Sequence, residues 1–237
     1  MGHRVNRLQP LKLREMSDSA VSMWFDPGET TGWSIMQVHP EALADPTIKI
    51  LENIESWSHG QIDCGATRGN AGVSAAEASE DEFGNGVSIS GEAAGVHECL
   101  ELVDVWPGTM VGIEDFVVRR YDQSRAFLSP VRVTAGIDYG LYLRFMSSFR
   151  QQPSEAKTTV TDARLKAWNF YRSEGSQVHA RDADRHNLTF LRKCKSGEKG
   201  RALRAQAWPH LFGEIVVGGQ VVQGPYYQPP RRPSRAS

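Results

Sequence analysis

Acidic side chains stand in two apolar segments of this chain where burial should exclude them. Asp26 ends the apolar run 20–26, and Glu114 with Asp115 interrupts the β-forming run 109–118. A buried carboxylate is costly unless a cation or hydrogen bonds compensate it. Because side chains alternate along a strand, only one member of the 114–115 pair can face the same way as Asp26. Asp26 alone would also suit a turn or a helix cap.

A third acidic cluster opens a helix expected at 179–193. Successive helical residues are rotated by about 100°, so His179 and Asp182 share one face, with His186 close to both. Asp184 falls on the other side, where we expect it to be solvated or in a salt bridge. His186 is expected in the core or behind the site rather than as a direct ligand.

Together these segments supply the candidate catalytic and metal-binding residues Asp26, Glu114, His179 and Asp182. Such an oxygen-rich set suits Mg²⁺, with Mn²⁺ as a substitute, better than zinc. Two such ions roughly 3.5–4 Å apart can activate water and stabilise the leaving oxygen of a phosphodiester. The chemistry indicated is therefore metal-dependent hydrolysis of nucleic acid.

Composition excludes several other classes. The chain has 237 residues and a formal net charge of -1, so contacts with phosphates must come from local basic clusters. Cys64, Cys99 and Cys194 stand far apart, which argues against a disulfide framework or a structural zinc site. No apolar run approaches the roughly 18 residues of a membrane helix, and the N-terminus lacks a secretory pattern. A cytoplasmic protein is expected.

The elements that must position the acids follow from hydrophobic patterning. Strands are expected at 20–26, 33–38 and 48–62, before any strong helix, which is an α+β opening with three antiparallel strands. Further along, the patterning predicts a helix from after Ser90 to Val105, a strand at 109–118, a long helix at 130–149, a short helix at 162–171 and the helix at 179–193.

Three segments lie outside this pattern. Residues 1–19 are a flexible basic arm, and residues 64–95 form a Gly-, Ala- and Ser-rich insertion that we expect to be mobile. Residues 194–237 are basic, then Gly- and Pro-rich, and are expected to be a disordered tail. The nuclease domain is therefore placed at 20–193.

Four motifs in order resemble RuvC-type Holliday-junction resolvases. They are Asp-Pro-Gly with Thr-Thr-Gly at 26–32, Ile-Glu at 113–114, Gln-Pro-Ser-Glu-Ala-Lys at 152–157, and His-x-x-Asp-Ala at 179–183. The third motif is similar to the phage-encoded branch of the family, which would place the protein in a host cytoplasm. Each motif alone is weak, but the ordered set is fairly specific.

The resemblance implies a ribonuclease-H-like fold, with a mixed five-stranded sheet flanked by helices. It also implies a homodimer that nicks four-way DNA junctions symmetrically and leaves 5′-phosphate ends, in DNA recombination and repair. Asp26 would bridge two Mg²⁺ ions, Glu114 would bind one, and His179 with Asp182 would complete the set. Some members place an aromatic residue three positions after the strand glutamate, whereas here Val117 stands there and Phe116 comes one residue early.

Local basic clusters are the candidate DNA contacts. Arg119, Arg120 and Arg125 follow the strand that carries Glu114, and a second cluster comprises Arg192, Lys193, Lys195, Lys199, Arg201 and Arg204. Lys157 and Lys166 are further candidates to approach phosphate. Contacts of this kind would make binding strongly salt-dependent, although such charge runs also occur on ordinary solvated surfaces.

Three other functions use the same sequence features. A nuclease of the same fold could act on flaps, forks or RNA–DNA hybrids, and a relative without activity could bind junctions. The 26–32 segment also resembles the phosphate hairpin of actin-like kinases, with 215–219 faintly like their adenosine loop. The chain is short for the two domains of such kinases and offers no convincing second phosphate loop.

Overall fold

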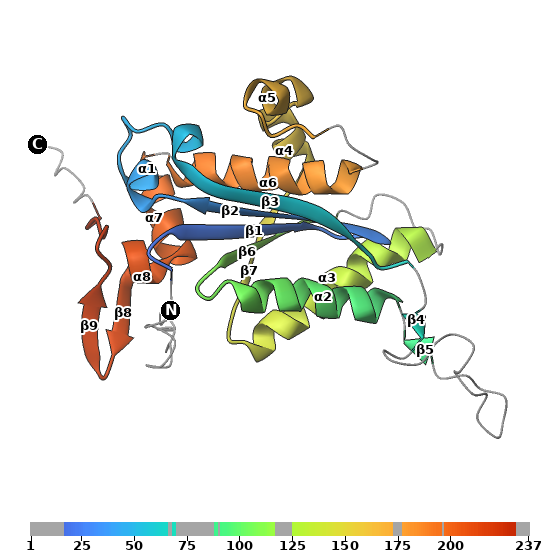
Figure 1. Cartoon of the computed structure of the whole chain (residues 1–237). Helices are drawn as coiled ribbons and strands as arrows, with labels where there is room; N and C mark the ends of the chain where they lie inside the picture. The colour runs from blue at the N-terminus through green and yellow to red at the C-terminus, as the bar shows by residue number, and fades with distance from the viewer. Residues whose placement is uncertain are drawn as a thin grey trace, which may run out of the picture.

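A mixed five-stranded sheet forms the centre of the computed structural model, which describes residues 17–65, 68–69, 88–89, 91–116, 125–172, 177–195 and 197–230. The strand order is β3-β2-β1-β6-β7. The strands β1 (Ala20–Asp26), β2 (Thr30–Val38) and β3 (Ile54–Asp63) run antiparallel to their neighbours (Figure 1). On the other side of β1, β6 (Met110–Glu114) pairs parallel with β1, and β7 (Ser148–Gln151) pairs parallel with β6. This order with these directions is the ribonuclease-H-like fold, which confirms the fold class predicted from the sequence.

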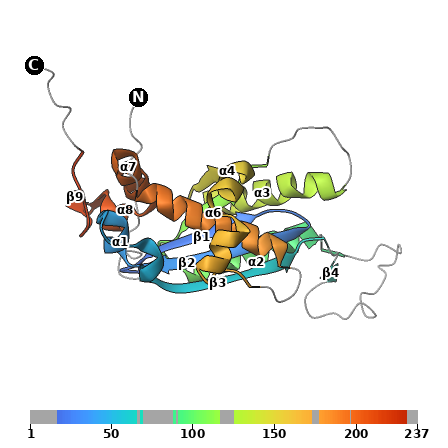
Figure 2. The same cartoon turned by 90° about the horizontal axis from the view of Figure 1, so that it is seen from above.

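Helices cover both faces of this sheet. Figure 1 shows α2 (Gly91–Val105) and α3 (Arg125–Leu143) on one face, and α4 (Pro153–Thr159), α5 (Asp162–Ala167) and α6 (Val178–Cys194) on the other. Figure 2 looks down on α6 with the sheet beneath it. The remaining elements are α1 (Pro40–Ala44), η2 (Ile50–Asn53), β4 (Arg68–Gly69), β5 (Ser88–Ile89), α7 (Gly197–Ala207), α8 (Pro209–Phe212), β8 (Glu214–Val217) and β9 (Gln220–Gln223).

Alternation along β1 divides the core in two. Ala20 and Trp24 pack into the cluster on the α6 face, and Val21, Met23 and Phe25 pack into the cluster on the α2–α3 face. The same alternation directs Asp26, at the end of the strand, to the α6 face. All seven residues of β1 are buried, so the strand holds the backbone of Asp26 in a fixed position.

The helix α6 is polar in composition but is buried against the sheet through a hydrogen-bonded centre. Asn187 donates to the carbonyl oxygens of Ser22 and Ser34 at 3.1 and 3.2 Å, and its own carbonyl oxygen accepts from the Ser22 hydroxyl at 2.6 Å. All three residues are fully buried. Buried polar groups satisfied in this way specify one arrangement, so the network holds α6 at one position along β1 and β2.

The long helix predicted at 130–149 is wrong at both ends. The helix α3 begins at Arg125 and ends at Leu143, and Phe145 follows with a φ of 56°. That left-handed residue ends the helix, and Ser148–Gln151 then pairs with β6 as the fifth strand. The predicted third strand also starts late, at Ile54, because η2 occupies Ile50–Asn53.

The prediction of a disordered tail after Lys193 is wrong for 197–230. Trp208 is fully buried and its indole donates to the carbonyl oxygen of Val21 at 2.7 Å, while the guanidinium of Arg204 donates to the carbonyl oxygen of Cys194 at 2.5 Å. Composition does not reveal these contacts, because the burial of one tryptophan can hold a segment that is polar on average. The end of the predicted insertion is likewise structured, since Gly91 already begins α2.

Residues 1–16 and most of 64–95 lie outside the described residues, so the predicted mobility of the arm and the insertion stays a prediction. Cys64 is fully buried beside Gly95, where a β-carbon would collide with its sulfur. In the described part of the chain, no helix is both long enough and apolar enough to cross a membrane.

Candidate active site

The carboxylates of Asp26 and Glu114 lie at the same edge of the sheet. In the parallel β1–β6 pair, Phe25 is level with Ile113, so Asp26 and Glu114 take the next positions along their strands. Met110 packs into the α6-side cluster, and Glu114 is four residues on, so it has the same facing as Asp26. Asp115 instead accepts a hydrogen bond from the side-chain amide of Gln152. Of the two neighbouring acids, Glu114 is the one that joins Asp26.

His179 reaches this edge from the first turn of α6. Its Nδ1 lies 2.9 Å from the Oδ2 of Asp26. The approach depends on Gly32, which is paired with Asp26 in the β1–β2 register. A β-carbon on residue 32 would lie 2.7 Å from the backbone nitrogen of Ala180, and closer still to the carbonyl group of His179. The glycine of the Thr-Thr-Gly motif therefore lets the helix start pass directly over the strand.

Asp182 faces the same site and contacts two cations. Its Oδ2 is 3.1 Å from the Nζ of Lys157 on α4, and its Oδ1 pairs with the guanidinium of Arg185 one turn further along α6. Arg185 also pairs with Asp162 at the start of α5. Three helices thus meet at Asp182, and its side chain is only 10% exposed.

Glu114 is held from behind by His186. The His186 Nε2 lies 2.7 Å from the Oε2 of Glu114, and the imidazole is stacked on Trp24 with ring centroids 5.4 Å apart. The histidine side chain is 1% exposed, which places it under the site rather than on its surface. The prediction that His186 lies in the core or behind the site is confirmed.

The pKa values show that these groups share one electrostatic environment. Burial raises the pKa of Asp26, the hydrogen bond from His179 opposes that rise, and the charges of Glu114 and Asp182 add to it. The hydrogen bond to Asp26 raises the pKa of His179. Burial works to lower the pKa of Lys157, but its pair with Asp182 and the charges of Glu114 and Asp26 raise it overall. Three carboxylates therefore concentrate negative charge at this edge.

The donor chemistry of this edge fits a hard divalent cation. Three carboxylates that repel one another, together with an imidazole, are ligands of the kind that Mg²⁺ and Mn²⁺ take. Among the described residues, no three His, Cys, Asp or Glu side chains are already spaced to hold a metal ion. The carboxylates are turned instead toward Lys157, Arg185, His179 and His186. Metal binding by this set requires those side chains to turn inward from their present partners.

Asp184 corrects one expectation. It does face away from Asp182, as the helical angle predicts, but it is fully buried rather than solvated. Its Oδ1 accepts a hydrogen bond from the Trp57 indole at 2.8 Å, and its Oδ2 lies 2.5 Å from the Nδ1 of His59. Asp184 does have polar partners, but they lie in the interior instead of at the surface, because β3 covers that side of α6.

The sequence reasoning missed this buried group and the role of Gly32. Trp57 and His59 are spaced by two in the strand β3, so alternation places them on one face. That spacing, beside an acid on the unused face of a helix, is the signal that could have identified the pair. For Gly32, the signal was a glycine inside a β-forming segment, which often marks a close approach of another backbone.

The predicted DNA contacts fall in three places. Arg119 and Arg120 lie outside the described residues, as does Val117, and Arg125 begins α3. Lys157 is at the acidic edge rather than on a separate basic surface. Arg192 and Lys193 line a recess at the far end of α6. Phe116, the displaced aromatic, packs edge-on against Phe127 at 5.6 Å between centroids.

Comparison with known proteins gives similarities of structure. A scan against protein-family models and a search of curated proteins find no match. Among solved structures, the chain is similar to Thermus thermophilus RuvC in complex with a Holliday junction substrate, with 12% identity and a TM-score of 0.46, over 75% of this chain and 96% of that one. A second structure of Thermus thermophilus RuvC gives 14% identity and a TM-score of 0.43, over 74% and 95%.

Proposed function

We propose that this protein is a Mg²⁺-dependent endonuclease that nicks branched DNA, with the four-way junction as its substrate. The observation that carries the proposal is the meeting of Asp26, Glu114 and Asp182 with His179 at one edge of the sheet. Three strand and helix carboxylates are brought together there at a cost in folding stability. Divalent cations bound by these carboxylates would offset that cost and would act on a phosphodiester.

In this proposal each residue has a distinct task. Asp26, Glu114, Asp182 and His179 hold the divalent ions, which when bound supply Lewis acidity and an activated water. His186 orients the Glu114 carboxylate through its Nε2. Lys157, freed from Asp182 as the carboxylates turn inward, presents its ammonium to the scissile phosphate. Attack of water on the phosphorus breaks the P–O3′ bond and leaves 5′-phosphate and 3′-hydroxyl ends.

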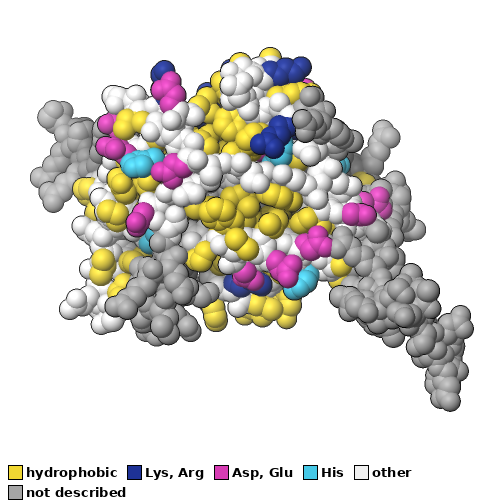
Figure 3. Space-filling model, viewed as in Figure 1, with side chains coloured by type: hydrophobic (Ala, Val, Ile, Leu, Met, Phe, Trp, Pro, Cys, Tyr) yellow, Lys and Arg dark blue, Asp and Glu magenta, His cyan; other side chains and the backbone are white. Residues whose placement is uncertain are grey.

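A symmetric substrate suits a symmetric protein, and the α3 end of the molecule offers a surface for a second copy. Four large apolar side chains there are strongly exposed: Tyr139 at 64%, Tyr142 at 73%, Leu143 at 56% and Phe145 at 89%. Figure 3 shows hydrophobic side chains at the lower edge of the molecule, beneath the helices α2 and α3. Clustered exposure of this kind marks interaction surfaces, so we propose a two-fold homodimer through α3.

The test is a cleavage assay on a labelled four-way junction, a flap, a fork, an RNA–DNA hybrid and a plain duplex, in Mg²⁺ or EDTA. Wild type is expected to make paired, Mg²⁺-dependent nicks in the junction. Asp26→Asn and Glu114→Gln are expected to bind the junction and leave it uncut, whereas Glu41→Gln, at an exposed acid of α1, should cut normally.

Other outcomes redirect the proposal. Preferential cutting of flaps, forks or hybrids would keep the metal site and change the substrate. Tight junction binding without nicks in Mg²⁺ or Mn²⁺ would make this a binding protein and defeat the catalytic claim.

A further inference from the structure

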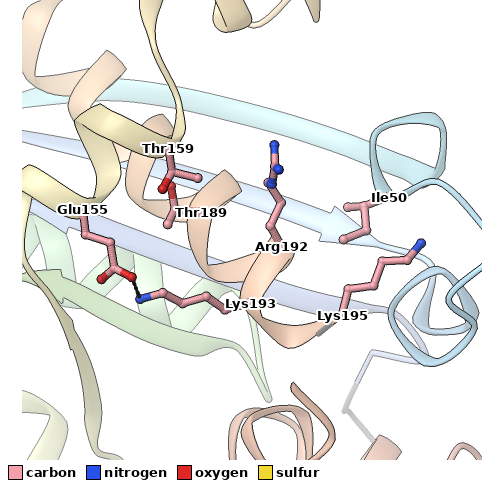
Figure 4. A pocket seen from close by; sticks show the side chains of 7 residues that line it. All are labelled: Ile50, Glu155, Thr159, Thr189, Arg192, Lys193 and Lys195. Carbon is pink, nitrogen blue, oxygen red and sulfur yellow. Dashed lines mark ion pairs between the residues drawn. The ribbon is translucent and has the colours of Figure 1, made fainter. Parts of the chain in front are cut away.

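A recess of about 380 Å³ lies at the C-terminal end of α6, away from the acidic edge. Its walls come from the last turns of α6, from α4 and from the start of η2, where Ile50 is the one apolar lining residue among those described. Figure 4 shows the basic side chains of the α6 end and the two threonines Thr159 and Thr189 around this space. Six of the seven lining residues are therefore polar or charged.

The charge of the recess is positive. Arg192, Lys193 and Lys195 line it, against a single acid, Glu155. The Glu155 carboxylate lies 2.7 Å from the Nζ of Lys193 and so is matched by that one cation (Figure 4). The described lining thus has three cations and one acid. Cations at a helix C-terminus partly offset the helix dipole. Here the cations also line a recess that has room for an anion.

A buried hydroxyl supplies an independent sign of a ligand. Thr189 lines the recess and is 2% exposed, and its Oγ1 finds no hydrogen-bond partner among the described residues. A buried hydroxyl without a partner is disfavoured. Thr159, across the recess on α4, brings a second hydroxyl to the same space. An oxyanion at this point would accept from both hydroxyls and from the cations.

The recess continues into a surface of paired cations and aromatic rings. Arg192 lies over Trp168 at 5.8 Å, and the ring of Tyr171 is approached by both Lys166 and Arg181 at 4.7 and 5.1 Å. Arg181 stands one residue before Asp182 in α6, so these cations extend along the helix toward its N-terminal half. Figure 3 shows Lys and Arg side chains over α5 in the upper part of that view.

We propose that the recess binds a backbone phosphate of the DNA strand, a few nucleotides from the scissile phosphate. The inference rests on the proposed function and deepens it. Thr189 is seven residues from Asp182, or about 10 Å along α6, so the bound phosphate belongs to a nucleotide close to the scissile one. No aromatic ring lines the recess among the described residues, so the ligand group is a phosphate rather than a stacked base.

The test measures junction binding by the full-length protein in EDTA, across a range of salt concentrations. The double variant Arg192→Gln/Lys195→Gln is expected to weaken binding about tenfold and to reduce the salt slope by about 1, the value for one phosphate contact. Thr189→Val, which keeps the shape of the side chain, should weaken binding about threefold without a change in slope. Arg150→Gln, at a cation of β7 that lies outside the recess and pairs with Asp138, should have neither effect.

Two further arms separate the alternatives. Nicking by the recess variants should need more protein in proportion to their loss of affinity, because their defect lies in DNA binding. Inorganic phosphate is the free-anion probe: if it raises the melting temperature of wild type but not of the double variant, while the salt slopes are equal, the recess is a small-anion site and the proposal fails. Equal affinities and slopes without any phosphate effect also overturn it.

Failure of the proposed function has a different signature. If wild type binds the junction with the expected slope difference but never nicks it in Mg²⁺ or Mn²⁺, catalysis fails and the phosphate site stands. If wild type nicks the junction with identical slopes in all variants, the nuclease stands and the phosphate site fails. If wild type binds no DNA, both are wrong.

Discussion

Gly32 of β2 lies directly under the backbone of His179, at the first turn of α6. A β-carbon on residue 32 would be 2.7 Å from the Ala180 nitrogen and would overlap the His179 carbonyl group. Gly32 is also the register partner of Asp26. The distance between the His179 ring and the Asp26 carboxylate, 2.9 Å, is therefore set by a residue that has no side chain of its own.

Substitution of Gly32 by alanine should displace the start of α6 and reduce nicking about 100-fold. The reason is that a misplacement of about 1 Å in a catalytic constellation costs this much. Junction binding should persist, since it depends on more distant cations. Gly28→Ala is the matched control, because a β-carbon there meets the Thr30 carbonyl oxygen at an ordinary 3.4 Å. Equal rates for the two variants would show that Gly32 does not set the site.

Local pattern predicted the strand that carries the first acid and the facing of the other acids. The run 20–26 matches β1 residue for residue, because an apolar run that ends on an acid and a Pro-Gly turn has few other solutions. Helical angle alone separated Asp182 from Asp184. Strand alternation predicted that only one of Glu114 and Asp115 could face as Asp26 does, and the resemblance to the Ile-Glu motif indicated Glu114. Such local periodicities survive folding because they are properties of the backbone.

What the sequence did not predict depends on contacts between distant segments. His59 is 125 residues from its partner Asp184, and Trp208 reaches Val21 across 187 residues. Neither separation leaves a trace in local hydropathy. The ion pair between Lys157 and Asp182 is similar, because it depends on how α4 lies across α6. These tertiary pairs decide which polar residues are buried, and composition cannot reveal them.

Lys157→Gln should increase the affinity for Mg²⁺ and slow the reaction. Removal of the ammonium leaves the charges of Asp26, Glu114 and Asp182 less compensated, so the Mg²⁺ concentration for half-maximal nicking should fall a few-fold. The maximal rate should fall about 10- to 100-fold, because a cation beside the phosphate is lost. A Mg²⁺ titration of nicking measures both, with Lys49→Gln, at an exposed lysine that pairs with Glu52, as the control. A raised Mg²⁺ requirement would contradict this account.

The buried pair of His59 and Asp184 should be important for stability. In His59→Ala, Asp184 keeps the hydrogen bond from the Trp57 indole but loses its contact with the imidazole, and the loss of one partner of a buried acceptor costs about 1–3 kcal/mol. His59→Gln keeps an amide donor and should lose less than half of that. Urea unfolding of both variants provides the comparison. If the alanine and glutamine variants are equally stable, the hydrogen bond to Asp184 has no energetic importance.

Stability should fall in mild acid through His210 of α8. Burial lowers the pKa of this histidine in the folded protein. A group with a lowered folded pKa contributes its full stability above its unfolded value, near 6.5, and loses it as the pH falls below that value toward the folded pKa. Thermal melts of wild type and His210→Gln between about pH 7.5 and 5 should show a shallower decline in the variant. Parallel curves would assign the acid loss to other groups.

The exposed end of α3 should determine the oligomeric state. Tyr142 is 73% exposed beside Leu143, within the proposed interface, so Tyr142→Glu would place a charge against the same charge of a two-fold partner. Sedimentation equilibrium should then report a monomer for this variant and a dimer for wild type. Val221→Glu changes another exposed apolar residue, which lies on β9 and is 65% exposed. This variant should leave the dimer intact. Symmetric nicking should fall with the dimer, because each copy holds one acidic edge and one junction needs two coordinated nicks. A monomeric wild type would refute the interface, whereas a dimer that survives Tyr142→Glu would place it on another face.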